Sequence, residues 1–304
     1  VTVPTANDRT ETCELDLTLM NLGEFCNVHF DPAFEEKLSD AERNLYATLV
    51  QGTEAGQERL DVSACGMTDV DVLRAFLQNV LNTQLMDVRV SDRVTVVIRG
   101  GVIAEVHLSY LPQVFSRAVS TSTVEQGIAH ALAAVDDSMT NVEKALVLHD
   151  YLVREVDYDL NEPYVMDSYR LEGVFIKRIA VCQGYALAYS RLLSELGIES
   201  YVVSSDEMNH AWNLINLDGN WFHVDCTWDD PTNGYEVDFC RGGFVHSHGR
   251  AGSEDLSVEV GFSHGIAVDE GKFTHTGAHK CLDCVTANSA KSENRHMAIL
   301  QLVR

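Results

Sequence analysis

The sequence is poor in positive charge. Its 22 lysine and arginine residues are outnumbered by 46 aspartate and glutamate residues, which gives a formal net charge of −24 at pH 7. Such an excess of negative charge repels phosphate groups, so the composition excludes general electrostatic binding of nucleic acid or of an anionic membrane surface. The chain also lacks a run of about 18 apolar residues, so no transmembrane helix is predicted. Basic or neutral binding partners are more compatible with this net charge than acidic partners are.

Cysteine is too sparse to form a disulfide scaffold, because eight cysteines are spread over 304 residues. The hydrophobic content of 45% is enough to bury cores of ordinary size in one or two domains. The chain begins at Val1 and continues with polar residues, which is typical of a mature secreted protein or of a chain trimmed at its start. We therefore expect an extracellular or cell-surface location.

Residues 1–120 are predicted to form a smaller amino-terminal α+β domain, and residues 121–304 a second domain with carboxy-terminal loops. The Ser/Thr-rich passage at 116–123 is the predicted boundary between them. We find no group of reactive side chains in the first domain, so its role is open. Its predicted elements are a strand at 14–19, helices capped by Ser39 and Asp69, and a β-hairpin over 94–108.

Two capping boxes, Thr123 to Gln126 and Thr140 to Glu143, predict helices that run through Val135 and Arg154. His149 lies on the second of these helices. A lone histidine on a helix is more often a hydrogen-bonded structural residue than a catalytic one.

Three short motifs between residues 179 and 231 carry reactive side chains. Cys182 opens Cys-Gln-Gly-Tyr-Ala, His210 precedes Ala-Trp-Asn, and Asp225 lies within Val-Asp-Cys-Thr-Trp. Apolar residues at helical spacing follow Cys182, so this cysteine is predicted at a helix N-terminus. There the unpaired amides and the helix dipole favour a thiolate.

The His and Asp motifs are predicted on strands, the second of which spans 221–227. Asp218-Gly219 is a hairpin signal between the two strands. Alternation along a strand puts Asp225 and Cys226 on opposite faces, so Asp225 can lie beside His210 across the hairpin. An imidazole that holds the thiol proton, oriented by a carboxylate, is the arrangement that activates a cysteine nucleophile.

Each of these residues also has a commoner structural interpretation. A single cysteine on an apolar helix is usually a core residue, a histidine before tryptophan is usually structural, and an aspartate before Thr-Trp often caps a turn. Cys226, the rival thiol, has no helix N-terminus beside it and is predicted to lie in the core. The three motifs together, in this order, favour the catalytic interpretation over a degenerate or binding-only site.

At these motifs the chain resembles the transglutaminase-like superfamily, which includes transglutaminases, papain-like bacterial peptidases and peptide N-glycanases. In that family the cysteine heads a helix within Gly-Val-Cys-x-Gly-Tyr-Ala, the histidine precedes Ala-Trp-Asn, and the aspartate shortly precedes Thr-Trp-Asp-Asp. The resemblance covers about residues 140–231, including the helix that leads into the core in bacterial members. Ala180 and Asn209 replace two familiar glycines, and neither change removes a reactive group.

The resemblance implies an α+β fold with a papain/transglutaminase-like core, in which the nucleophile helix packs on an antiparallel sheet. It implies a cysteine enzyme that acts on peptide or glutamine-type amides through an acyl-thioester, without a cofactor. A peptidase or amidase is preferred. A transglutaminase that forms isopeptide cross-links and a non-catalytic surface binding or scaffolding module are the alternatives. The implied catalytic residues are Cys182, His210 and Asp225, and the candidates for binding the oxyanion or the substrate are Gln183, Trp212 and Trp228.

A possible zinc motif lies near the carboxyl end, where His275, His279, Cys281 and Cys284 fall within ten residues. Most structural zinc sites join two separated ligand pairs, and no second CxxC lies nearby. We therefore expect no bound zinc, with a Cys281–Cys284 disulfide or unligated thiols as alternatives. No EF-hand pattern for calcium occurs either. Loops are expected at 242–264, and a final strand at 297–303.

Overall fold

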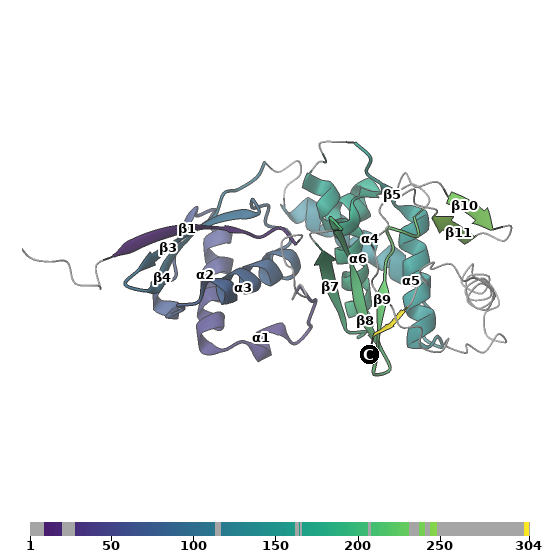
Figure 1. Cartoon of the computed structure of the whole chain (residues 1–304), viewed down its shortest axis with the longest axis horizontal. Coiled ribbons are helices and arrows are strands. Elements are labelled where there is room, and N and C mark those ends of the chain that lie inside the picture. The colour runs from purple at the N-terminus through teal and green to yellow at the C-terminus, as the bar shows by residue number, and fades with distance from the viewer. Residues whose placement is uncertain are drawn as a thin grey trace, which may run out of the picture. The chain divides into compact units, whose positions relative to one another are not determined.

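The computed structural model describes residues 9–19, 28–112, 117–161, 164, 166–205 and 208–230, together with strands at 237–240, 244–247 and 301–303. The chain divides into two compact units (Figure 1). Unit 1 comprises Val1–Ser122 and Val203–His210, and unit 2 comprises Thr123–Val202 and Ala211–Arg304.

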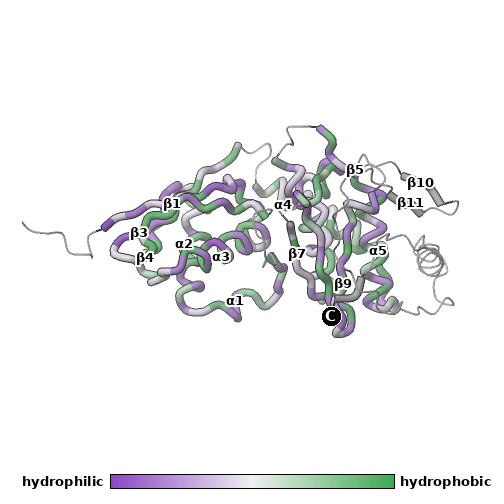
Figure 2. The backbone as a smooth tube through the Cα atoms, viewed as in Figure 1, coloured by the Kyte–Doolittle hydropathy of each residue, from purple (hydrophilic) through white to green (hydrophobic). Residues whose placement is uncertain are grey.

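Unit 1 contains a four-stranded antiparallel sheet in the order β1-β3-β4-β2. Its core is apolar and includes Leu15, Leu45, Leu73 and Val96. The helices α2 and α3 carry both hydrophobic and hydrophilic residues, as amphipathic helices do (Figure 2). The elements are β1 (Thr10–Asp16), α1 (Phe34–Lys37), α2 (Asp40–Glu54), β2 (Arg59–Asp61), η2 (Ser63–Cys65), α3 (Val70–Thr83), β3 (Arg93–Arg99) and β4 (Val102–His107).

The predicted helix starts in unit 1 are confirmed. The Ser39 hydroxyl accepts a hydrogen bond from the amide of Glu42, and the Glu42 carboxylate accepts one from the amide of Ser39. The Asp69 carboxylate accepts from the amides of Asp71 and Val72 at the start of α3. Both contacts satisfy amides that have no acceptor within the helix.

Unit 2 has helices and most of a second four-stranded sheet, in the order β12-β9-β8-β7, of which the end of β7 and the first residue of β8 are assigned to unit 1. Two further strand pairs, β5-β6 and β10-β11, lie outside this sheet. The elements are α4 (Arg117–Leu132), α5 (Asn141–Glu155), β5 (Asp157–Tyr158), η3 (Met166–Tyr169), η4 (Gly173–Lys177), β6 (Ile179–Ala180), α6 (Cys182–Glu195), β7 (Ser200–Ser205), β8 (His210–Leu217), β9 (Asn220–Val224), β10 (Val237–Cys240), β11 (Phe244–Ser247) and β12 (Gln301–Val303). The predicted α+β fold is confirmed.

Helix α6 is the central helix of unit 2. Every residue from Cys182 to Ser190 is buried, so the helix is covered on all sides. The Asn213 side chain on β8 donates a hydrogen bond to the carbonyl oxygen of Ala186, at 2.9 Å. Three residues further along the helix, the Tyr189 hydroxyl donates to the carbonyl oxygen of Ala145 on α5, at 2.9 Å. These buried bonds join α6 both to the sheet and to α5.

Several predicted boundaries were wrong. The strand expected at 14–19 spans Thr10–Asp16, and the helix expected to run through Val135 ends at Leu132. The helix expected to begin at Thr123 begins at Arg117, so residues 117–123 of the Ser/Thr-rich passage are helical. It holds no glycine or proline, and serine and threonine cost a helix only fractions of a kcal/mol each, about 0.5 kcal/mol relative to alanine. The strand expected to run through Thr227 ends at Val224, because the next residue, Asp225, turns the chain.

The predicted helix start at Thr140 is confirmed by a capping box with Glu143, and the hairpin is confirmed by left-handed φ angles of 53° at Asp218 and 87° at Gly219. Strand β12 covers the last part of the strand expected at 297–303. The loops expected at 242–264 and the motif at 275–284 lie outside the described residues, apart from the strand residues of β11.

Candidate active site

Cys182 is the first residue of α6, as predicted. The first backbone hydrogen bond of the helix joins the amide of Tyr185 to the carbonyl of Val181, at 3.1 Å. The amides of residues 182–184 therefore have no acceptor within the helix and lie at its positive end. The Cys182 side chain is buried, with a relative exposure of 7%. A thiolate, or an oxyanion formed next to it, would be stabilised in this setting.

Close packing against η3 fixes the start of α6. The amide of Val181 donates to the carbonyl oxygen of Ser168 at 2.9 Å. A Cβ atom on Gly184 would lie 2.4 Å from that same oxygen, so only glycine fits at this position. The side-chain nitrogen of Gln183 donates to the carbonyl oxygen of Tyr169, at 3.3 Å. The Cys-Gln-Gly sequence thus packs the start of α6 closely against η3.

His210 is the first residue of β8, and its side chain is buried. Asn209, just before it, has a left-handed backbone with a φ angle of 46°. Asparagine is the residue that best tolerates this conformation after glycine. The replacement of the familiar glycine by Asn209 therefore preserves the backbone that introduces His210.

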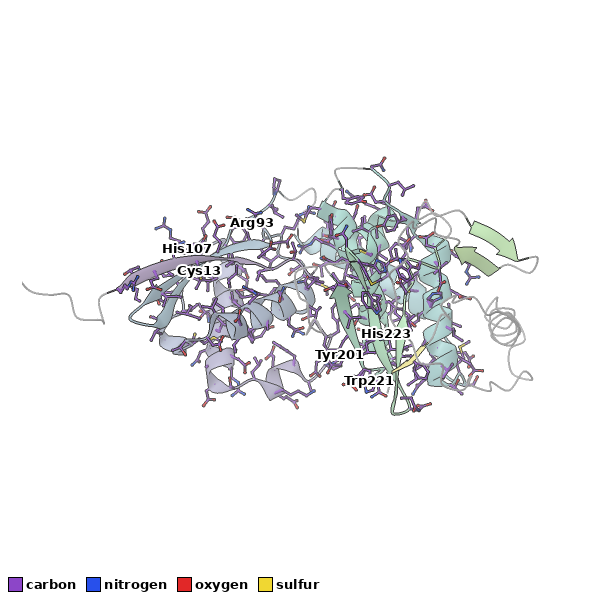
Figure 3. The ribbon with its side chains drawn as sticks, viewed as in Figure 1. Cys13, Arg93, His107, Tyr201, Trp221 and His223 are labelled. Atoms are coloured by element: carbon purple, nitrogen blue, oxygen red, sulfur yellow. The ribbon has the colours of Figure 1, made fainter. Side chains whose placement is uncertain are left out.

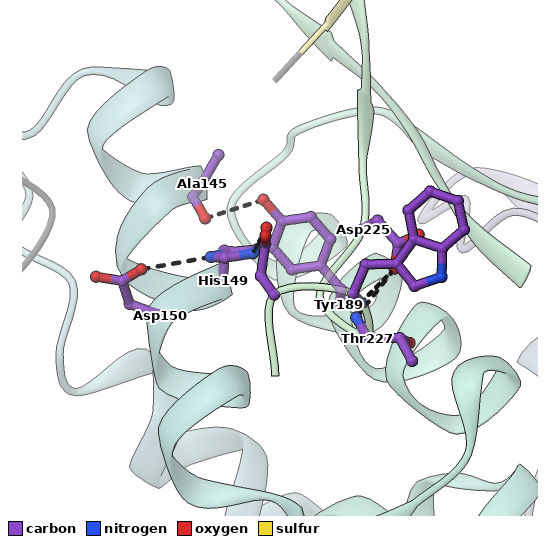
Figure 4. Close-up of polar contacts among 8 residues, drawn as sticks. Ala145, His149, Asp150, Tyr189, Asp225 and Thr227 are labelled. Atoms are coloured by element: carbon purple, nitrogen blue, oxygen red, sulfur yellow. Dashed lines mark hydrogen bonds and ion pairs between the residues drawn. The ribbon is translucent and has the colours of Figure 1, made fainter. Parts of the chain in front are cut away.

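Asp225 lies in a turn rather than on the predicted strand. Its Oδ1 atom accepts hydrogen bonds from the amides of Thr227 and Trp228, at 3.0 and 3.1 Å (Figure 4). The turn-capping role that is common for such an aspartate is thus present. A carboxylate has acceptor sites on both oxygens, so this role and the orientation of an imidazole are compatible.

Trp212 is joined to His223 on the neighbouring strand. The indole nitrogen donates to Nδ1 of His223 at 2.8 Å. Burial lowers the pKa of His223, which favours the neutral ring whose Nδ1 accepts this bond. Figure 3 labels His223 and Trp221 on β9 and Tyr201 on β7, and the ring centres of Tyr201 and Trp221 lie 5.8 Å apart. The binding roles of Gln183, Trp212 and Trp228 stay predictions. The arrangement of Cys182, His210 and Asp225 as one catalytic site also stays a prediction.

Cys226 is buried, as expected for a core thiol. Burial, followed by the neighbouring carboxylates of Asp225 and Asp229, raises the pKa of this thiol well above its usual value. A thiol in this state forms little thiolate at neutral pH, so Cys226 is a poor nucleophile.

A buried polar cluster around His149 was not anticipated from the sequence. The ring of His149 lies on α5 between Asp150, whose Oδ1 is 3.3 Å from Nδ1, and Asp229, whose Oδ2 is 3.2 Å from Nε2 (Figure 4). Burial lowers the pKa of His149, but the two carboxylates outweigh it and raise the pKa to about 9. No pattern in the sequence indicated this cluster, because His149 and Asp229 lie 80 positions apart in the chain.

Neither a metal site nor a membrane span emerges from the described part of the chain. Within those residues, no three His, Cys, Asp or Glu side chains are grouped so that they could hold a metal ion. Likewise, none of the helices described there is long and apolar enough to cross a membrane. The four candidate zinc ligands from His275 to Cys284 lie outside this part.

Comparison with known proteins gives matches to one superfamily. The model of the transglutaminase-like superfamily matches residues 126–226, a segment that includes Cys182, His210 and Asp225. The kyphoscoliosis peptidases of Mus musculus and Homo sapiens are each 24% identical over 126 residues, which cover 36% of this chain and 19% of theirs. A solved structure of a TGase is 15% identical with a TM-score of 0.32, over 49% of this chain and 46% of that one. The segment matched to the kyphoscoliosis peptidases thus spans about a fifth of the length of those relatives.

Proposed function

We propose, from the match of residues 126–226 to the model of the transglutaminase-like superfamily, that this protein is a cysteine enzyme that hydrolyses peptide or glutamine-type amides. The observation that carries the proposal is the position of Cys182 as the first, buried residue of the central helix α6. A cysteine kept only for packing has no need of a helix N-terminus, whereas a nucleophile gains a stabilised thiolate there.

In the proposed reaction, the Cys182 sulfur attacks the carbonyl carbon of the amide, and amides at the start of α6 bind the oxyanion. His210 has taken the proton of the Cys182 thiol, and it gives this proton to the departing amine as the carbon–nitrogen bond breaks, which leaves an acyl-thioester on Cys182. His210 then takes a proton from water, the hydroxide attacks the thioester, and the acid and the free thiol are released. Asp225 orients the His210 ring throughout.

Transfer of the acyl group to a lysine amine instead of water would make the enzyme a transglutaminase. Both outcomes use the same three residues, so the choice depends on access of the acceptor and exclusion of water. We favour hydrolysis because the matched curated relatives are named peptidases. The net charge of −24 would also attract lysine-rich protein acceptors, which keeps transamidation as the alternative.

The test is to incubate the protein with casein and a fluorescent primary amine and to follow cleavage and amine incorporation in parallel. Hydrolysis predicts new casein fragments without amine incorporation, and transamidation predicts the reverse. Cys182→Ala is expected to abolish either activity. Cys13→Ala is the matched control, since Cys13 lies on β1 of unit 1. Activity that survives in the Cys182→Ala variant would refute the proposal, and absence of any activity would favour a binding module.

A further inference from the structure

The turn at 225–230, which carries Asp225, is held in place from inside the core. Cys226, Thr227 and Asp230 within it are all less than 5% exposed. The amide of Asp230 donates to the carbonyl of Thr227 at 3.2 Å, and the two amide bonds to Asp225 close the other half of the turn. The turn is therefore a compact unit, and a contact made at its end constrains the carboxylate at its start.

Side chains from two helices contact the end of this turn. The Asp229 carboxylate contacts Nε2 of His149 on α5, at 3.2 Å. The neighbouring Asp230 carboxylate accepts a hydrogen bond from the hydroxyl of Tyr185 on α6. Since α6 also begins with Cys182, the turn is tied to the helix of the nucleophile and to the helix of His149 at adjacent residues.

The geometry at His149 favours a charged ring. Both ring nitrogens face carboxylate oxygens, one from Asp150 and one from Asp229. An ionised carboxylate can only accept, and a neutral imidazole has only one N–H group, so both contacts are hydrogen bonds only in the imidazolium. The raised pKa of about 9 agrees with this geometry.

The side chains around the His149 ring also favour its charged form, which can hold the turn in place. Among the described residues, the titratable groups in contact with the ring are Asp150 on its own helix, Tyr189 on α6 and Asp229 in the turn, and the Asp225 carboxylate interacts in turn with Asp229. The imidazolium is the one cationic group within this set, and without it the carboxylates of Asp225 and Asp229 would repel each other. A neutral glutamine at position 149 could fill the space and keep one hydrogen bond, but it could not offset this repulsion.

We propose that His149 is a positioning residue, which through its ion pair with Asp229 holds the 225–230 turn so that the Asp225 carboxylate is presented to His210. This inference rests on the proposed function, since Asp225 is the carboxylate of the proposed triad. His149 touches neither the substrate nor the thiol in this scheme. It acts only through the turn.

A double-mutant cycle tests this role. Wild type, His149→Gln and Asp229→Asn are compared with Asp225→Asn and with each change combined with Asp225→Asn, using cysteine-dependent cleavage of casein. We expect each single change in the ion pair to lower kcat about 10- to 100-fold with little change in KM. In the Asp225→Asn background the same change should cost less than about 2-fold. Equal losses in both backgrounds would overturn the positioning role, because a general loss of folded enzyme acts regardless of Asp225.

His130→Gln is the matched control for these variants. His130 is another histidine on a helix of unit 2, but its Nδ1 contacts the Tyr151 hydroxyl, at 3.1 Å, rather than the turn. Its activity should stay within about 2-fold of wild type. A loss as large as that of His149→Gln would mean that any helical histidine has this effect, and would overturn the inference.

A second readout separates failure of this inference from failure of the proposed function, because it needs no substrate. The rate at which iodoacetamide alkylates Cys182 is measured against pH in wild type, Asp225→Asn and the isosteric Asp229→Asn. We expect Asp229→Asn to shift the profile in the same direction as Asp225→Asn. A shift with Asp225→Asn alone would overturn the role of His149 and leave the triad standing. An unchanged profile in both variants would refute the triad and the positioning role together.

Discussion

The side-chain amide of Asn213 on β8 donates a hydrogen bond to the carbonyl oxygen of Ala186 on α6, and both residues are buried. This bond explains the last residue of the His-Ala-Trp-Asn motif. Its asparagine joins the strand that begins with His210 to the helix that begins with Cys182. The motif therefore contains a structural residue as well as a candidate catalytic one.

Asn213→Ala should lower the free energy of unfolding by about 1–3 kcal/mol, because a buried hydrogen bond is lost and a cavity is left. Chemical denaturation followed by circular dichroism measures this change. Asn220→Ala on the exposed end of β9 is the control and should have an effect within about 0.5 kcal/mol. Equal stability of the two variants would show that the Asn213 bond contributes nothing measurable.

The charge on His149 should make stability depend on alkaline pH. The pKa of His149 is raised from 6.5 to about 9 in the folded protein, so the stabilisation is fully present below pH 6.5 and is lost as pH rises through about 9. The change is up to about 3 kcal/mol. Urea denaturation at a series of pH values should show this fall in wild type and a flatter curve in His149→Gln. A wild-type curve that is flat between pH 6.5 and 9.5 would contradict the assignment.

Asp225 should show two separable roles. Asp225→Asn keeps an oxygen that can accept from the amides of Thr227 and Trp228, so we expect near-native stability with a strongly reduced but measurable rate. Asp225→Ala removes this acceptor and should also cost about 1–2 kcal/mol of stability, as does loss of a helix cap. Thermal unfolding and casein cleavage, measured on both variants, distinguish these outcomes. If the asparagine variant were fully active, the carboxylate would have no catalytic role.

Cys182 should be the thiol that reacts fastest with iodoacetamide. It lies at a helix N-terminus, whereas burial and nearby carboxylates raise the pKa of the rival thiol of Cys226. Brief substoichiometric labelling followed by peptide mapping measures the order of reaction. Faster labelling of Cys226 or Cys240 would count against Cys182 as the nucleophile.

We expect no stoichiometric zinc at His275, His279, Cys281 and Cys284, because no second CxxC lies nearby. Elemental analysis of protein purified without chelator tests this. About one zinc per chain that disappears in Cys281→Ser or Cys284→Ser would show that these residues form a metal site.

The sequence by itself determined the local features of this protein. The helix that begins at Cys182, the capping boxes at Ser39 and Thr140, and the hairpin at Asp218-Gly219 all depend on residues close together in the chain. Hydrogen bonds from neighbouring side chains and the few residues that tolerate left-handed backbone decide such features, so short motifs reveal them. The same motifs pointed to the transglutaminase-like superfamily.

Only the tertiary structure decided how distant residues are paired. The strand expected at Asp225 became a turn, because its carboxylate satisfied two amides that a strand would have left to a neighbour. His149 and Asp229 are far apart in the chain, and nothing local to either residue announces the contact. An ion pair with a buried histidine forms only when folding brings both charges together, so its members look like ordinary polar residues until the fold is known.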